Sequence, residues 1–201
     1  MTIPLSDRES QLTSDLAAAV EEYRRDDNLG ALLDRLRALA VRATPEALAA
    51  AAEPFRDMPE VVIPLFEHIV SRRPTDARAM VVLANAYWLT GRGPEAVSEL
   101  ASRALAADPD NRGAWHLWAL TESRVRERVA RWQQVAERFP ADQLARAALA
   151  DNAASLAGAE HDRLALDLAI TTYEGLLRDA ASPAQRSALE RAIETLRGWR
   201  L

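Results

Sequence analysis

One stretch of the sequence decides the fold: Pro74–Asn111, which reads PTDARAMVVLANAYWLTGRGPEAVSELASRALAADPDN. It begins and ends with the same three-residue motif, Pro-x-Asp/Asn, which occurs again at Pro140-Ala141-Asp142. Proline ends a helix because it lacks the N–H group and its ring collides with the preceding turn. An Asp or Asn two residues later accepts hydrogen bonds from the free N–H groups of the next helix. A stop-and-restart signal at similar spacing therefore predicts an array of helical repeats.

The composition favours an all-α protein. Of the 201 residues, 49% are apolar, alanine is abundant, and glycine is limited to 7 residues. Alanine is the strongest helix former, and the alternating Val, Ile and Thr runs that would indicate strands are nearly absent. Apolar residues at helical spacing predict about eleven antiparallel helices in one continuous domain with short connections.

The charged and reactive residues exclude several kinds of chemistry. All 25 basic residues are arginine, and the sequence has neither lysine nor cysteine. Lysine-dependent phosphate loops, Schiff bases, disulfides and thiolate nucleophiles are therefore excluded. The net charge of −5 argues against a nucleic-acid partner. Residues 1–20 do not resemble a secretory signal, and no stretch is apolar enough to span a membrane, so we expect a cytoplasmic protein.

The residues after Asp76 resemble the tetratricopeptide repeat (TPR), a helix–turn–helix unit of about 34 residues. The TPR pattern consists of W-x2-L-G-x2-Y in the first helix, A-x3-F in the second, and a closing P. The matching residues here are Met80, Leu83, Ala84 and Tyr87, then Ala96 and Leu100, and finally Pro109, with Gly91 at the turn between the helices. This copy is the most regular one, and its neighbours match the pattern less well.

The resemblance implies an α-α superhelix, a TPR-like solenoid, whose concave face is lined by the first helix of each pair. Its copies cover about residues 43–75, 77–109, 112–140 and 143–183. Residues 1–42 would form an N-terminal helical pair and residues 184–201 a C-terminal helix, and these two segments would cap the array. The best-known TPR clamp holds the carboxylate of a chaperone tail with Lys, Asn and Arg. Only Asn85 matches that clamp, so we do not expect this function.

The implied concave face supplies the candidate partner-binding residues. They are Arg78, Val81, Asn85, Trp88, His116, Leu120, Ala147 and Asp151, accompanied by Ala47, Ala51, Gly113 and Ala154. We expect a shallow, mostly apolar channel with Asn85, His116 and Asp151 as polar anchors. Trp88 is the candidate hot spot, because tryptophan often dominates binding energy at the centre of an interface. The alternative is that Trp88 packs in the core.

A basic stretch offers a second candidate surface. Arg124, Arg128 and Arg131 are interleaved with glutamates, a pattern typical of a solvated helix face with internal ion pairs. Contact with an acidic partner is the alternative use of these three arginines.

The remaining motifs give no catalytic or cofactor site. Trp115, Trp118 and Trp132 lie at helical spacing, which predicts core packing rather than a cofactor box. No residues have the spacing of a Ser–His–Asp triad, paired catalytic carboxylates, a glycine-rich phosphate loop or a metal site. We therefore expect no enzyme activity, cofactor, metal or small-molecule substrate.

The predicted function is a non-catalytic protein–protein interaction module. It would act as a scaffold or as an assembly or accessory subunit that binds a partner peptide or helix in a concave groove. One alternative is an acidic TPR-type chaperone for a secreted or membrane-bound client. The alternative from another class is an enzyme or regulator with an unrecognised site.

Overall fold

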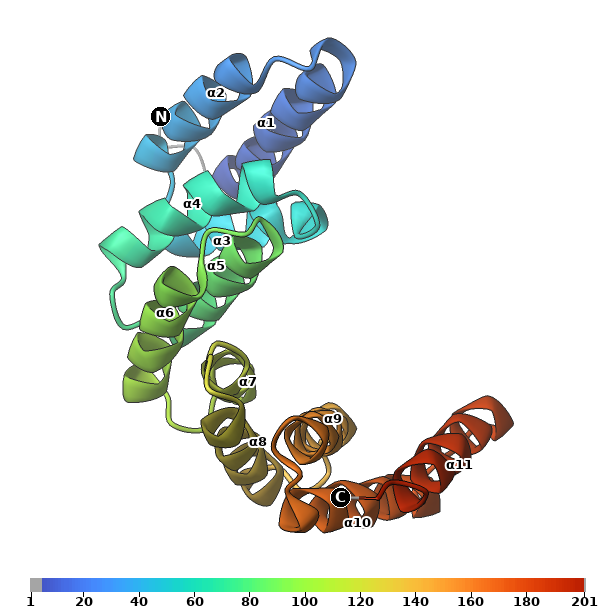
Figure 1. The fold of residues 1–201 in the computed structure, drawn as a ribbon. Coiled ribbons are helices and arrows are strands. Elements are labelled where there is room, and N and C mark those ends of the chain that lie inside the picture. Colours follow the sequence, from blue (N-terminus) through green and yellow to red (C-terminus); the bar gives the residue numbers. More distant parts are fainter. Residues whose placement is uncertain (1–4, 201) are drawn as a thin grey trace. The chain divides into compact units, whose positions relative to one another are not determined.

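The protein is all-α over the part of the chain that the structure describes, residues 5–200, with side chains from residue 7 onward (Figure 1). The structure is a computed structural model. Its helices are α1 (Leu5–Asp26), α2 (Leu29–Arg42), α3 (Pro45–Ala52), α4 (Pro59–Arg72), α5 (Ala77–Leu89), α6 (Pro94–Ala107), α7 (Arg112–Leu120), α8 (Val125–Arg138), α9 (Gln143–Glu160), α10 (Arg163–Arg178) and α11 (Pro183–Arg197). The ends of the predicted capping segments, residues 1–4 and 201, lie outside the described residues. The all-α prediction with about eleven helices is confirmed.

The Pro-x-Asp/Asn motifs that predict the repeat array lie at the starts of α5, α7 and α9. Asp76 accepts a hydrogen bond from the Ala79 N–H group at 3.0 Å and caps α5, and Asp142 caps α9 by accepting from Leu144 and Ala145. Asn111 accepts from the Ala114 N–H group at 3.1 Å at the beginning of α7. Each side chain satisfies an N–H group that has no partner within its own helix, which fixes the point at which that helix starts.

The chain divides into two compact units, Met1–Leu117 and Trp118–Leu201, where the sequence predicts one continuous domain. The boundary falls inside α7 and therefore inside the segment predicted as the third repeat, 112–140. In the first unit, α1 packs on α2 and α3, and α4 packs on α2, α3 and α5, while α6 covers α5. Long aliphatic side chains from successive helices fill this core, among them Leu16, Leu36, Leu48, Leu65 and Met80.

In the second unit, α9 lies between α8 and α10, and α11 packs on α10. Two close approaches shape this unit. Trp199 packs against the backbone of Gly158 near the end of α9, where an added Cβ would lie 3.3 Å from the indole ring. Arg146 of α9 crosses α10 at Gly175, where an added Cβ would lie 2.9 Å from its guanidinium. Glycine at these positions therefore lets a neighbouring side chain reach the helix backbone.

Helical spacing alone does not place two local features. The third helix ends at Ala52, and a short 3-10 turn, Glu53–Phe55, follows it, whereas helical spacing predicts an end near Arg56. Pro54 lies inside that turn, and its missing N–H group and its ring disfavour continuation of the α-helix there. The turn between α7 and α8, which no glycine or proline marks, occupies residues 121–124.

Candidate partner-binding surface

One side of α5 presents polar and aromatic side chains to solvent. Arg78, Asn85, Trp88 and Leu89 are all exposed, and we call this set the α5 face. Trp88 is 41% exposed and Leu89 is 75% exposed, although both belong to the large apolar residues that usually avoid water. The opposite side of the same helix buries Met80 and is part of the core. Trp88 is therefore not buried in the core, and its role in a partner-binding groove stays a prediction.

A hollow of about 510 Å³ lies beside the α5 face, in the first unit. We call it the α3–α5 hollow, and it is lined by Glu46, Ala49, Ala50, Glu53, Arg56, Phe66, Asp76, Arg78 and Ala79. Three of these residues are alanines, because α3 has the sequence PEALAAAA and α5 contributes Ala79. Because alanine side chains are small, they do not fill the space between α3 and α5.

The carboxylates that line the α3–α5 hollow are all engaged by neighbours. Glu46 pairs with Arg73 at 2.7 Å, and Arg73 also lies 3.5 Å from Asp76. Glu53 pairs with Arg56 at 2.7 Å. A carboxylate that pairs with a guanidinium keeps less of its charge available to a ligand.

Arg78 differs from those groups. Among the described residues, no hydrogen bond or ion pair engages its side chain, which lies exposed in the first turn of α5. Asn85, two turns further along, donates through Nδ2 to the Val81 carbonyl oxygen at 3.0 Å. Its side-chain oxygen is thereby left to accept from a ligand. The α5 face therefore combines a free cation, an acceptor and an exposed indole ring.

The other predicted groove residues of the first unit are less available. Val81 is half-buried, and it packs against Gly113, where an added Cβ would lie 2.8 Å from Val81 Cγ1. His116 is half-buried and interacts within the chain. Ala51 was expected to face the groove, but it is buried in the core. The phase of α3, which begins at Pro45, turns Ala50 outward in its place.

In the second unit, the predicted residues are Leu120, Ala147 and Asp151. Leu120 and Ala147 are half-buried. Asp151 is exposed and accepts a hydrogen bond from the Tyr173 hydroxyl group. Burial of Tyr173 and the adjacent Asp151 carboxylate raise the pKa of the Tyr173 hydroxyl well above its usual value. Tyr173 and Ala154 line a smaller hollow of about 270 Å³ between α9, α10 and α11.

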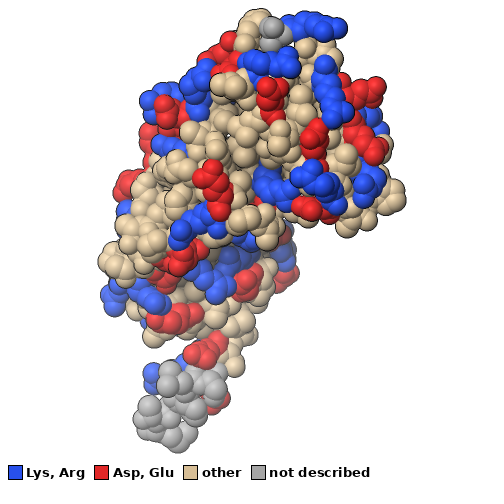
Figure 2. Space-filling view, turned by 90° about the horizontal axis from the view of Figure 1, so that it is seen from below, with Lys and Arg blue, Asp and Glu red and all other residues tan. Residues whose placement is uncertain are grey.

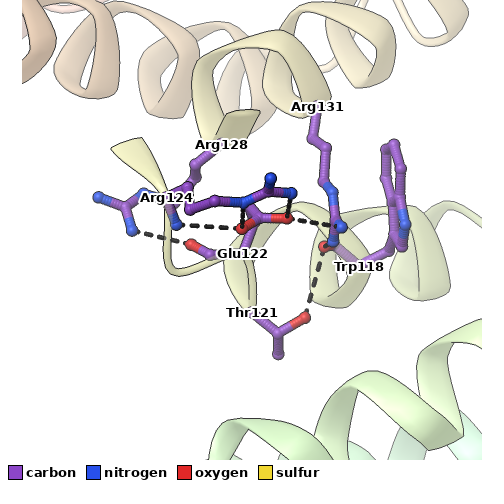
Figure 3. Close-up of polar contacts among 6 residues, drawn as sticks. All are labelled: Trp118, Thr121, Glu122, Arg124, Arg128 and Arg131. Atoms are coloured by element: carbon purple, nitrogen blue, oxygen red, sulfur yellow. Dashed lines mark hydrogen bonds and ion pairs between the residues drawn. The ribbon is translucent and has the colours of Figure 1, made fainter. Parts of the chain in front are cut away.

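Sequence reasoning missed a buried carboxylate that several groups hold. Glu122 is only 8% exposed, and it occupies the turn between α7 and α8 (Figure 3). Its Oε1 accepts from the Arg124 backbone N–H group at 3.0 Å, and its Oε2 pairs with Arg131 at 2.7 Å. The hydrogen bond from the Arg124 N–H group, followed by those from its side chain, lowers the pKa of Glu122 to about 2. We call Glu122 with Arg124, Arg128 and Arg131 the Glu122 turn.

The three predicted partner-contact arginines all belong to the Glu122 turn. Arg131 Nη1 donates to the Trp118 carbonyl oxygen at 2.7 Å, and its guanidinium lies 4.6 Å from the centroid of the Trp118 ring. Arg128 donates to the Glu122 carbonyl oxygen at 2.9 Å and to Asn152 at 2.7 Å. Arg124 is 70% exposed and pairs with Glu122 at 3.2 Å. Contact with an acidic partner stays a prediction, and within the chain Arg128 connects α8 to α9 while Arg131 connects it to α7.

Trp132 is buried on α8, whereas Trp115 and Trp118 are half-buried. Trp118 packs its ring against Arg131, and Trp115 donates through Nε1 to the Pro109 carbonyl oxygen at 2.8 Å. The three rings thus take part in structural contacts within the chain.

Other kinds of site find little support in the part of the chain that the structure describes. No group of three or more His, Asp or Glu side chains there could hold a metal ion. No helix within residues 5–200 combines the length and apolar character that crossing a membrane requires. Acidic and basic side chains are intermingled over the face that Figure 2 shows, rather than gathered by sign.

The helix order, the helix pairs and the capped restarts together define a TPR-like helical repeat fold. Comparison with solved structures confirms it. The chain is similar to MamA, with a TM-score of 0.60 and 14% identity over 79% of this chain and 94% of MamA. It is also similar to TTC0263, a thermophilic TPR protein of Thermus thermophilus, with a TM-score of 0.54 and 19% identity over 92% of this chain and 98% of that one. The sequence matches no protein-family model and no curated protein.

Proposed function

We propose that the chain is a protein-binding module whose α5 face and α3–α5 hollow hold a peptide or helix of a partner protein. The observation that carries this proposal is the exposure of Trp88 and Leu89 next to each other at the end of α5. When a partner covers a tryptophan in this setting, a large apolar area of its ring is removed from water, which favours binding. The TPR-like fold supports the proposal, because helical repeat arrays present extended surfaces to partners.

The surface is preformed, which supports a binding role. α5 is fixed at its start by the Asp76 cap and in its last turns by the Tyr87 hydroxyl group, which donates to Glu67 of α4 at 2.7 Å. Arg92 pairs with the same glutamate at 3.1 Å and lies over the Tyr87 ring. A rigid face requires little ordering when it binds, so a modest contact area gives useful affinity.

The first experiment is peptide selection on the intact chain, followed by affinity measurement. A display library of random short peptides is selected on the wild-type protein, and the recovered peptides are measured by fluorescence anisotropy. Trp88→Ala should weaken their binding by about tenfold or more, because loss of a hot-spot tryptophan costs about 2 kcal/mol or more. Leu164→Ala removes an exposed leucine from α10 and serves as the matched control that should bind as the wild type does.

Equal affinity of the wild type and Trp88→Ala for every recovered peptide would contradict the proposal. If Trp88→Ala instead caused a large loss of thermal stability, Trp88 would be a core residue that stabilises the fold rather than a binding residue.

The same exposed face is compatible with the chaperone alternative, in which it would cover an apolar client segment. A scaffold and a chaperone differ in the lifetime and number of their partners. A single stoichiometric partner recovered from native cells supports a scaffold or accessory subunit, whereas several clients that leave on export support a chaperone. The absence of catalytic function, the acidic-partner role of Arg124, Arg128 and Arg131, and the cytoplasmic location stay predictions of the sequence.

A further inference from the structure

We infer that the α3–α5 hollow selects a partner segment with one carboxylate side chain, Asp or Glu, which pairs with Arg78 beside small or apolar residues. This inference rests on the proposed function and specifies the chemistry of the partner. It begins with the charges that line the hollow. Of the five charged residues there, Glu46, Glu53, Asp76 and Arg56 have an ion-pair partner within the described chain, and Arg78 has none.

The surroundings of Arg78 favour a strong pair with a carboxylate. The hollow is walled by the methyl groups of Ala49, Ala50 and Ala79 and by the buried ring of Phe66. A ligand that fills this space removes water from around the guanidinium, and ion pairs strengthen when water is excluded. The guanidinium can also bind both oxygens of a carboxylate at once, which fixes the direction in which the ligand lies.

The hollow favours a single carboxylate over a phosphate group or a nucleic-acid backbone. Glu46, Glu53 and Asp76 line the same space as Arg78, so the local charge is close to balanced. A doubly charged phosphate, or a row of phosphates, would bring more negative charge than the one unpaired arginine of the hollow can offset. A carboxylate brings one charge, which Arg78 matches.

The position of Arg78 on α5 gives the ligand an orientation. Asn85 and Trp88 lie two and three turns further along the same helix, at about 1.5 Å of rise per residue. A segment whose carboxylate pairs with Arg78 can therefore donate a backbone N–H to the Asn85 side-chain oxygen and place an apolar side chain on Trp88. The three contacts together would define a short recognition motif.

The test is a double-mutant cycle on the peptides selected above. Each acidic residue of a recovered peptide is replaced by its amide, and affinity is measured for the wild type, Arg78→Gln and Arg37→Gln. Arg37 is an exposed α2 arginine that pairs with Asp34 outside the hollow, so it controls for the lost charge. We expect the acid-to-amide change to weaken binding about three- to tenfold in the wild type and Arg37→Gln, and to have no effect in Arg78→Gln.

The outcomes separate this inference from the proposed function. Peptides that lose affinity with Trp88→Ala but respond to the acid-to-amide change equally in wild type and Arg78→Gln would overturn the inference and leave the proposed function standing. Recovered peptides without any acidic residue would do the same. Tighter binding after replacement of the acidic residue by phosphoserine would overturn the preference for one carboxylate. Failure to recover any peptide would overturn both.

Discussion

The α5 face and the Glu122 turn use arginine in opposite ways. In the Glu122 turn, Arg131 is only 24% exposed and is held by a carboxylate, a carbonyl oxygen and an indole ring. On the α5 face, Arg78 is exposed, and no described residue pairs with it. Arg128 and Arg131, which belong to the sequence cluster, are thus bound within the chain, whereas the guanidinium of the isolated Arg78 has no partner among the described residues. A cluster of arginines in a sequence therefore does not by itself indicate cations that are free to bind a partner.

The first way to test this contrast is to remove the carboxylate at the centre of the Glu122 turn. Glu122→Gln keeps the size of the side chain but leaves Arg131 without its ion-pair partner in a half-buried site. We expect the free energy of unfolding of the second unit to fall by about 2–4 kcal/mol, because a partly buried charge loses its compensation. Urea denaturation of the intact chain measures this change.

Glu137→Gln is the matched control for that experiment. Glu137 lies exposed on α8 and accepts a hydrogen bond from Gln133 at 3.0 Å, so its replacement should change stability by less than about 0.5 kcal/mol. If the two variants unfolded at the same urea concentration, the Glu122 turn would not hold the second unit together.

Acid should remove the same stabilisation. The pKa of Glu122 is lowered to about 2 in the folded chain, below the value of about 4.3 for an unperturbed glutamate. A depressed folded pKa stabilises the protein above the unfolded pKa, and this contribution is lost as pH falls through the folded pKa. The stability gap between wild type and Glu122→Gln should therefore be full at neutral pH and shrink by about 1–3 kcal/mol between about pH 4.5 and about pH 2.

Chemical denaturation at a series of pH values measures that gap, and the subtraction cancels the titration of all other carboxylates. A gap that stayed constant down to about pH 2 would show that the Glu122 carboxylate is not the stabilising group.

The smallest expected effect distinguishes two arginines of the same turn. Arg131→Gln should lower the free energy of unfolding by about 1–2 kcal/mol, because it removes a hydrogen bond, an ion pair and the contact with the Trp118 ring. Arg124→Gln should cost less than about 1 kcal/mol, since the Arg124 side chain is largely exposed and its backbone N–H group still binds Glu122. Thermal unfolding of both variants measures the difference, and equal losses would contradict this ranking.

The order of the helices could be predicted from the sequence because its signals are local. Asp76, Asn111 and Asp142 cap their helices within three residues, so Pro-x-Asp/Asn alone indicates where α5, α7 and α9 begin. The exposure of Trp88 could not be predicted in the same way, because the sequence left both a groove position and a core position open for this side chain.

The rest depends on contacts that the sequence does not display. Glu122 and Arg131 meet because α8 folds back across the turn, and no local signal marks that turn. A glutamate three residues before a helix and an arginine further along it is the one pattern that could have suggested the pair. The sequence misplaces Ala51 because a run of alanines does not mark which side of α3 is buried, so an error of one residue in the phase exchanges Ala50 for Ala51.

The central claim is that binding depends on the isolated arginine and not on the clustered ones. The most direct measurement is the affinity of one selected acidic peptide for the wild type, Arg78→Gln and Arg124→Gln, determined by fluorescence anisotropy on the intact chain. We expect Arg78→Gln to bind about three- to tenfold more weakly and Arg124→Gln to bind as the wild type does. Weaker binding by Arg124→Gln, with Arg78→Gln unchanged, would contradict the account and return the partner site to the basic stretch of α8.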